Sequence, residues 1–267
     1  RQAVMPLPAL PDENAEYFLN LVFTEQNGFE RAARQLALRP IEKTAFVPAP
    51  FAYTARREPG AVEVNGGGFR VRFEKGTLCL LERGGERLLS SPMQFNLWRA
   101  PTDNDGIVNL FPRHIAEWNS ILLWDMKFHA ISDELRREPD CLRYEAAGRL
   151  LPSAKSAGFL IHVTYRVYAG GVVGVEIHGE PFGFQMTKTL PRIGVCFKMD
   201  KRMDHVRWYG RGFEENYRDR KLCAPVGVYE SSVAQLNTQY DVPQECGNRM
   251  GVRTLSVTDD AGAGVVV

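Results

Sequence analysis

The sequence predicts an all-β protein whose main part is a large antiparallel β-sandwich. Short runs in which apolar and polar residues alternate recur along most of the 267 residues, and glycine-rich turns separate several of them. Closely spaced short strands joined by glycine turns are typical of a meander in an antiparallel sandwich. Few segments have helical periodicity, so we expect few helices.

The first part of the chain is expected to contribute two strands. Residues 16–23 are aromatic and β-branched with partial alternation, and residues 36–38 form a second, shorter apolar run. Residues 25–34 are predicted to form a short helical turn or a wide loop. Two or three strands cannot bury a core alone. Four prolines between residues 40 and 59 indicate an extended linker, which we place at residues 48–58.

The β pattern becomes strong at Ala61. Residues 61–65, 69–74 and 77–82 alternate and are separated by glycine-containing turns. Further strands are expected at residues 124–132, 141–150, 158–169, 172–179, 187–197, 205–209 and 254–258. The best helix candidate is residues 112–122, because Pro112 suits a first helical turn and Ile115, Trp118 and Leu122 share one face. The last residues, 263–267, stop within an apparent strand, so we expect a sandwich truncated at its C-terminal end.

Bulk composition excludes several classes of function. With 33 basic and 32 acidic residues, the chain has no charge excess that favours nucleic acid or a membrane surface. No apolar run approaches the roughly 20 residues of a membrane span. The five cysteines are scattered without a CxxC pair, which indicates reduced thiols and argues against a zinc knuckle or a disulfide framework. The compartment stays open between cytoplasm and periplasm.

The most informative stretch is residues 95–106, where an apolar run ends at Trp98 and an arginine, a proline and three Asx-type residues follow. Pro101 fixes its own φ and keeps Ala100 out of the helical region. The Asx side chains can bond nearby backbone N–H groups, and Gly106 can adopt a positive φ. This pattern predicts a rigid loop, braced by side chains, that leaves a buried strand.

Three ordered motifs carry a family resemblance. Residues 98–105 read Trp-Arg-Ala-Pro-Thr-Asp-Asn-Asp, residues 208–221 contain Trp-Tyr-Gly-Arg-Gly-Phe-Glu-Glu-Asn-Tyr, and residues 242–249 read Val-Pro-Gln-Glu-Cys-Gly-Asn-Arg. Together they resemble the C-terminal region of the large bacterial β-galactosidases of the lactose-splitting type, glycoside hydrolase family 2. The family usually has proline where this chain has Phe213 and asparagine where it has Cys246. The match covers most of residues 59–267 and, more weakly, the first fifty residues.

The resemblance implies a domain plan. Residues 1–47 would be the terminal strands of an immunoglobulin-like sandwich, and residues 59–267 a galactose-mutarotase-like supersandwich. The whole enzyme would hydrolyse terminal β-D-galactosides with retention, using glutamates of an upstream (β/α)₈ barrel of the same polypeptide. The resemblance leaves magnesium and sodium as possible ions of that full-length enzyme, with no cofactor or metal in this fragment. Exposed sheet edges tend to pair, which favours a homo-oligomer.

Glycoside hydrolysis needs two carboxyl groups, an acid and a nucleophile or base, on either side of the sugar. The loop carboxylates of this chain lie among arginines or in Asx turns, where they are more often ion-paired braces. We therefore assign no catalytic residue and predict that the fragment alone is inactive. The residues expected to form a substrate-pocket wall or structural brace are Arg99, Asp103, Asn104, Asp105, Glu215, Asn216, Tyr217, Arg220, Glu245, Asn248 and Arg249.

Two other functions remain open at this point. A carbohydrate-binding module would need an exposed aromatic platform, for which Tyr217 is the better candidate, while Trp98 and Trp208 are expected in the core. An aldose 1-epimerase-like isomerase would need a histidine and a glutamate in one pocket. His178, on a strand near Glu180, is the nearest candidate, although a strand histidine is more often structural. The tryptophan that lines the galactose pocket in the family belongs to a segment beyond residue 267.

Overall fold

A computed structural model describes residues 4, 6–10, 12, 14–40, 46, 49, 52–106, 114–183 and 187–267. Within this part of the chain the structure is built almost entirely from antiparallel strands, and no helix is long and apolar enough to cross a membrane. The prediction of an all-β fold is confirmed. The strands are β1 (Tyr17–Thr24), β2 (Glu30–Arg39), β3 (Tyr53–Glu58), β4 (Ala61–Gly66), β5 (Phe69–Glu74), β6 (Thr77–Arg83), β7 (Glu86–Arg87), β8 (Ser91–Asn96), β9 (Met126–Arg137), β10 (Leu142–Pro152), β11 (Gly158–Val167), β12 (Val173–Phe182), β13 (Gly194–Lys198), β14 (His205–Arg211), β15 (Val226–Ser232), β16 (Thr254–Thr258) and β17 (Gly264–Val266), and the helix is α1 (His114–Ser120).

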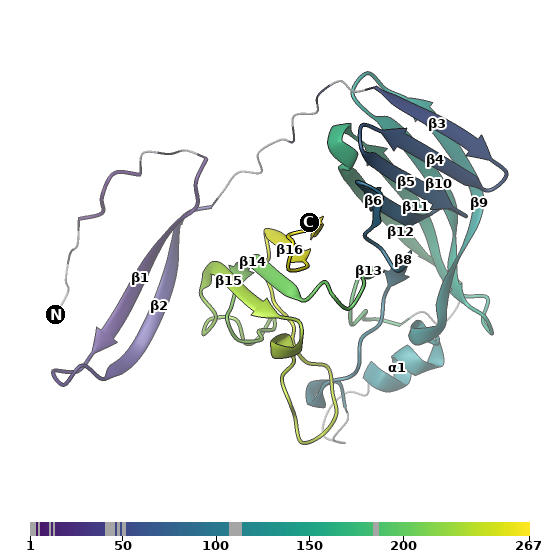
Figure 1. The fold of residues 1–267 in the computed structure, drawn as a ribbon. Coiled ribbons are helices and arrows are strands. Elements are labelled where there is room, and N and C mark those ends of the chain that lie inside the picture. Colours follow the sequence, from purple (N-terminus) through teal and green to yellow (C-terminus); the bar gives the residue numbers. More distant parts are fainter. Residues whose placement is uncertain are drawn as a thin grey trace.

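The main core lies between two sheets (Figure 1). One has the order β3-β4-β5-β6-β7 and the other the order β12-β11-β10-β9. Phe73 of the first sheet packs with its ring centroid 4.9 Å from that of Tyr144 and 4.7 Å from that of Tyr165 in the second. All three rings are fully buried, and the hydroxyl of Tyr165 donates to the carbonyl of Gly76 at 3.2 Å. Burial of each such ring stabilises the fold by about 1.5–3 kcal/mol.

Alternation decides which residues enter this core. In β10, buried residues occupy every second position from Leu142 to Leu150, and in β11 the buried positions include Ile161, Val163 and Val167. Because successive side chains of a strand point to opposite faces, this period places one face against the partner sheet. The alternation in the sequence therefore predicts these strands with the correct face inward.

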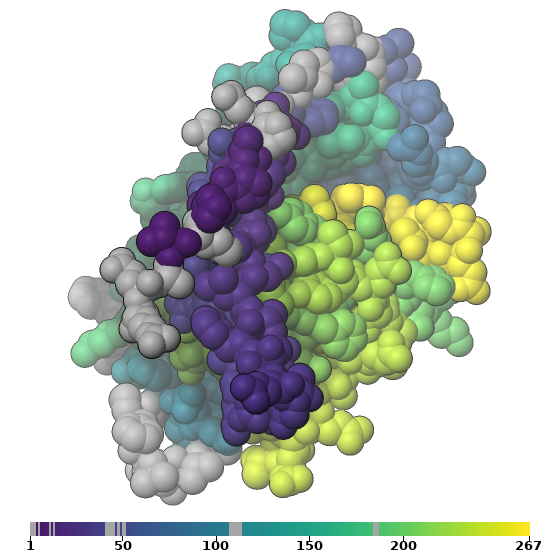
Figure 2. Space-filling view, turned by 90° about the vertical axis from the view of Figure 1, so that its left-hand side faces the viewer, coloured from purple at the N-terminus to yellow at the C-terminus, as the bar shows by residue number. Residues whose placement is uncertain are grey.

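A third sheet, of order β15-β14-β16-β17, and a two-stranded ribbon of β8 and β13 complete the fold. The β1–β2 hairpin lies in front of the third sheet in Figure 2. Its Gln35 side chain donates to the carbonyl of Val226 at 2.9 Å and accepts from the N–H of Val226 at 2.7 Å. Glu16 pairs with Arg253 at 2.8 Å and also bonds the hydroxyl of Tyr209. These contacts join the first described strands to the edge and the middle of the third sheet.

Several local predictions are wrong. Residues 25–34 were expected in a turn or loop, but β2 already begins at Glu30, because pairing with β1 gives its backbone groups partners along the whole strand. Part of the expected linker forms β3, which pairs with β4. The strand expected at residues 187–197 is limited to β13, where β8 supplies a partner. The expected helix ends at Ser120, and its first two residues, 112 and 113, lie outside the described residues.

Candidate functional site

The loop that follows β8 is held together by Asp105, which is only 8% exposed. Both carboxylate oxygens accept from the guanidinium of Arg99, at 2.6 and 3.2 Å, and one also accepts from the N–H and the hydroxyl of Thr102, at 2.7 and 2.8 Å. Burial raises the pKa of Asp105, but the bonds from Arg99 and Thr102 outweigh it, so the pKa lies below its usual value. Gly106 closes the loop at φ 104°, a conformation that favours glycine.

Glu215 plays the same part in the second motif loop. One of its oxygens accepts from Arg220 at 2.5 Å and from the hydroxyl of Tyr240, and the other accepts from the N–H of Gly247 at 2.8 Å. Burial opposes ionisation of this carboxyl group, yet these bonds together lower its pKa. The bonds to Glu215 thus favour its ionised form, whereas a glycosidase acid requires a raised pKa.

The second and third motif loops are joined through buried amide groups. Asn216 is fully buried, and its backbone N–H donates to the carbonyl of Asn248 at 2.7 Å. The Asn248 side chain returns a bond to the carbonyl of Asn216 at 2.7 Å, and the Asn216 side chain accepts from the N–H of Met250 at 2.9 Å. Two loops about thirty residues apart in sequence are thus held together by hydrogen bonds that involve their backbone groups.

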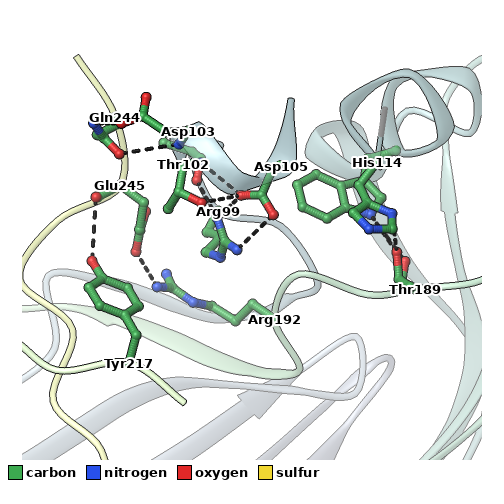
Figure 3. Close-up of polar contacts among 12 residues, drawn as sticks. Arg99, Thr102, Asp103, Asp105, His114, Thr189, Arg192, Tyr217, Gln244 and Glu245 are labelled. Carbon is green, nitrogen blue, oxygen red and sulfur yellow. Dashed lines mark hydrogen bonds and ion pairs between the residues drawn. The ribbon is translucent and has the colours of Figure 1, made fainter. Parts of the chain in front are cut away.

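The third loop is also joined to the first (Figure 3). Gln244 accepts from the N–H of Asp103 at 3.3 Å and donates to its carboxylate at 3.2 Å, and the N–H of Glu245 donates to the carbonyl of Pro101 at 3.1 Å. Tyr217, from the second loop, donates its hydroxyl to the carbonyl of Glu245 at 3.4 Å. The three motif loops, residues 98–106, 211–221 and 242–250, therefore form one bonded assembly, which we call the motif cluster.

Arg192 lies outside the three motif loops but is bonded to the cluster, a contact that the sequence did not reveal. Its guanidinium pairs with the carboxylate of Glu245 (Figure 3). Arg192 lies just before β13, in a segment that we expected to form a strand. It belongs to none of the three sequence motifs, so no sequence pattern assigned it to the site. The signal present in the sequence was the Pro191 break, which indicates a loop at this position.

Two further predicted residues, Arg249 and Tyr217, bond backbone carbonyls, and Asn104 has no side-chain bond within the described part of the chain. Arg249 donates to the carbonyls of Leu236 and Gly247, both at 2.8 Å, and burial lowers its pKa. Tyr217, expected as an exposed contact, is half-buried, and burial raises its pKa to about 12. Asn104 is exposed and lies outside the bond network of the cluster.

An open hollow of about 680 Å³ lies beside the motif cluster. Arg99, Arg192 and Glu245 line it on the side of the cluster, and Trp98, Trp124, Asp125 and Lys127 are also among its lining residues. Two carboxylates, Asp125 and Glu245, thus face the same hollow. Each is paired with a cation, and bonds from the Ser153 backbone and from Lys127 lower the pKa of Asp125. This is the opposite of the raised pKa expected of a general acid.

Neither metal binding nor isomerase chemistry fits the described side chains well. Glu138, Asp140 and Cys141 come close together, but Arg143 already neutralises Glu138, and burial raises the pKa of the Cys141 thiol to about 12. Magnesium needs several oxygen ligands around one point, and Asp105, Glu215 and Glu245 of the motif cluster are each bound by an arginine instead. His178 lies 3.2 Å from Glu180, but both are exposed on β12, and no described histidine lines the hollow.

Fold and site together define the class: an antiparallel β-sandwich region whose polar loops are tied into one bonded assembly. The model of the β-galactosidase small chain family matches residues 65–267, and the chain belongs to this family. The prediction made from the three motifs is confirmed.

Curated relatives agree with this assignment. The chain is similar to a β-galactosidase of Priestia megaterium, with 31% identity over 90% of this chain and 22% of the relative. It is also similar to β-galactosidases of Vibrio cholerae, with 30% identity over 94% of this chain and 26% of the relative, and of Actinobacillus pleuropneumoniae, with 25% identity over 88% and 22%. The chain thus spans about a quarter or less of the length of these relatives.

Proposed function

We propose that this chain is the C-terminal, non-catalytic portion of a β-galactosidase that hydrolyses terminal β-D-galactosides with retention. The observation that carries the proposal is the motif cluster, in which Asp105, Glu215 and Glu245 are each bound by an arginine. Carboxylates held in this way brace loops by charge-assisted bonds and do not supply a pair that flanks a sugar. The bond-breaking glutamates would lie in an upstream barrel domain of the same polypeptide.

In this proposal the motif cluster completes the wall of the active site and contacts the catalytic domain. Loop-to-loop bonds join its three loops, while the side chains of Asn104 and Phe213 are exposed. Rigid loops presented in this manner suit a surface against which a neighbouring domain forms a cleft. The edge strands of the β12-β11-β10-β9 sheet would serve domain or subunit contacts, because unpaired strand edges favour association.

The test separates the fragment from the complete enzyme. The purified 267-residue chain should give no turnover of a chromogenic β-galactoside, and clear hydrolysis by it would contradict the non-catalytic role. In the full-length polypeptide, Asn104→Ala should raise KM or lower kcat while the melting temperature is unchanged, because this exposed side chain has no bond within the described part of the chain. Asn20→Ala, at an exposed position of β1, is the matched control. Unchanged kinetics for Asn104→Ala would contradict the wall role.

A further inference from the structure

The hollow beside the motif cluster is lined by polar side chains from two parts of the fold. The β8–β13 ribbon contributes Gln94, Asn96 and Cys196, and the turn before β9 contributes Trp124 and Asp125. Gln94 and Asn96 alternate with the buried Met93, Phe95 and Leu97 of the core. The volume of about 680 Å³ falls in the range of about 300–1,000 Å³ found for small-molecule sites. An opening of this size, with polar groups between apolar ones, has the composition of a ligand site.

Trp124 is the aromatic surface of this hollow. It is 58% exposed, whereas its neighbour Leu123 is 2% exposed, so the short 3₁₀ turn at Leu123–Asp125 anchors one side chain in the core and presents the next to solvent. The other described tryptophans are buried or half-buried. A large exposed indole beside a hollow is the kind of flat apolar surface that packs against the C–H face of a ring.

Polar groups next to this indole are held in place. Asp125 accepts from the N–H of Ser153 at 2.9 Å, Lys127 lies 3.2 Å from Asp125, and the Lys127 ammonium donates to the Ser153 hydroxyl at 2.7 Å. The carboxylate and the ammonium thus lie side by side as an acceptor and a donor. Adjacent hydroxyl groups of one ligand can bond both at the same time.

The charges around the hollow cancel in pairs. Lys127 compensates Asp125, Arg192 compensates Glu245, and the Arg99 guanidinium is taken up by Asp105. A phosphorylated or carboxylated ligand would meet no uncompensated partner among the described lining residues, whereas a neutral ligand rich in hydroxyl groups would find donors and acceptors there at no cost in buried charge.

We propose that this hollow is a binding site for the pyranose ring of a neutral saccharide, stacked on Trp124 and bonded by Asp125, Lys127 and the Arg192–Glu245 pair. The site lies within this chain, so it does not depend on the proposed hydrolytic function of the whole polypeptide. It binds without reaction, since both of its carboxylates are engaged by cations and no described histidine lines it.

The experiment uses the 267-residue chain after a cooperative thermal transition has shown that it is folded. Ligand-observed saturation-transfer NMR is recorded with lactose, with galactose, and with sorbitol, which offers hydroxyl groups but no ring face. We expect saturable transfer to the two sugars and none to sorbitol. Absence of saturable transfer from the folded chain would overturn the proposal.

Variants then locate the site. Trp124→Ala should weaken sugar binding at least about tenfold, and Lys127→Met at least about threefold, with melting temperatures unchanged. Phe23→Ala, which removes an aromatic ring of equal exposure (57%) from the β1–β2 hairpin, should bind as the wild type does. Equal binding by Trp124→Ala and wild type would overturn the proposal. So would sedimentation that shows the wild-type chain, but not Trp124→Ala, self-associating through this face.

Discussion

At the scale of single residues, Asp105 decides how the first motif loop is built. It accepts bonds from both nitrogens of the Arg99 guanidinium and from the N–H and hydroxyl of Thr102. The carboxylate is buried, so its own hydration is lost and these bonds must replace it. Removing its charge would leave the Arg99 guanidinium without its ionic partner.

Asp105→Asn should therefore lower the free energy of unfolding by about 2–4 kcal/mol, because a mostly buried ion pair loses one member while the other stays buried. Urea denaturation measures this loss. The control is Glu134→Gln, which removes an equally direct but fully exposed pair with Arg136 and should leave stability almost unchanged. Similar losses in both variants would contradict the bracing role of Asp105.

The pKa values of Asp105 and Glu215 lie below the usual 3.8 and 4.5 in the folded protein. Their contribution to stability is present above these usual values and is lost as the pH falls through the folded-state pKa. The melting temperature should thus drop between about pH 5 and pH 3, and less steeply in a variant carrying Asp105→Asn and Glu215→Gln. Glu230→Gln, an exposed control, should follow the wild type. Parallel curves for all three proteins would refute the assignment.

Residue patterns predict this site only in part. The Asx-rich stretch and the arginines near Glu215 predict braced loops. Asp105 bonds Arg99, and Glu215 bonds Arg220, so these partners are close in sequence. Arg192 and Gln244 bond across 53 and 141 residues, and no local pattern encodes such a partner. Trp124 is equally hidden, because only the packing of Leu123 turns it toward solvent.

At the scale of elements, the turn between β5 and β6 requires a glycine both for its backbone conformation and for the close packing around it. Lys75 and Gly76 both have positive φ, at 48° and 77°. A Cβ on Gly76 would lie 2.8 Å from a ring atom of Phe128 and 2.9 Å from Ala146. Gly68, in the turn before β5, has a similar φ of 81° but open space around it. The two positions separate backbone strain from packing.

We expect Gly68→Ala to cost about 1–2 kcal/mol of stability, the strain of a left-handed alanine. Gly76→Ala should cost about 1–3 kcal/mol more, because its methyl group must also displace core atoms. Chemical denaturation of both variants gives the difference. Equal losses of stability in the two variants would show that the core around Phe128 accommodates the added methyl group without strain.

Strands could be predicted from the sequence where one of their faces is buried. They could not be predicted where both faces are exposed. The runs at β5, β10 and β11 alternate because they face the core. By contrast, β2 reads Glu-Arg-Ala-Ala-Arg-Gln at its start, a composition with helical preference, and most of the strand is exposed. Its conformation comes from pairing with β1, and that of β3 from pairing with β4. Such strands are decided by a neighbour and leave little signal in their own residues.

At the scale of the whole molecule, the β1–β2 hairpin is attached through Gln35, which bonds both backbone groups of Val226. Gln35→Ala should speed hydrogen exchange of the Val226 amide at least about tenfold, because that N–H loses its partner. Gln235→Ala, which removes a glutamine that bonds Ser231 and Ser232 at the opposite end of β15, should leave this amide unchanged. Unaltered exchange in Gln35→Ala would mean that the hairpin does not dock in solution.

The cysteines acquire a practical use from their positions. Burial raises the pKa of Cys79 to about 11 and that of Cys141 to about 12, so both thiols stay protonated near neutral pH and shielded from reagents. Cys223 is exposed beside the hairpin, among the residues that line the gap between it and β15. A maleimide fluorophore would accordingly attach first at Cys223. Its emission would report directly on whether the β1–β2 hairpin is packed against β15.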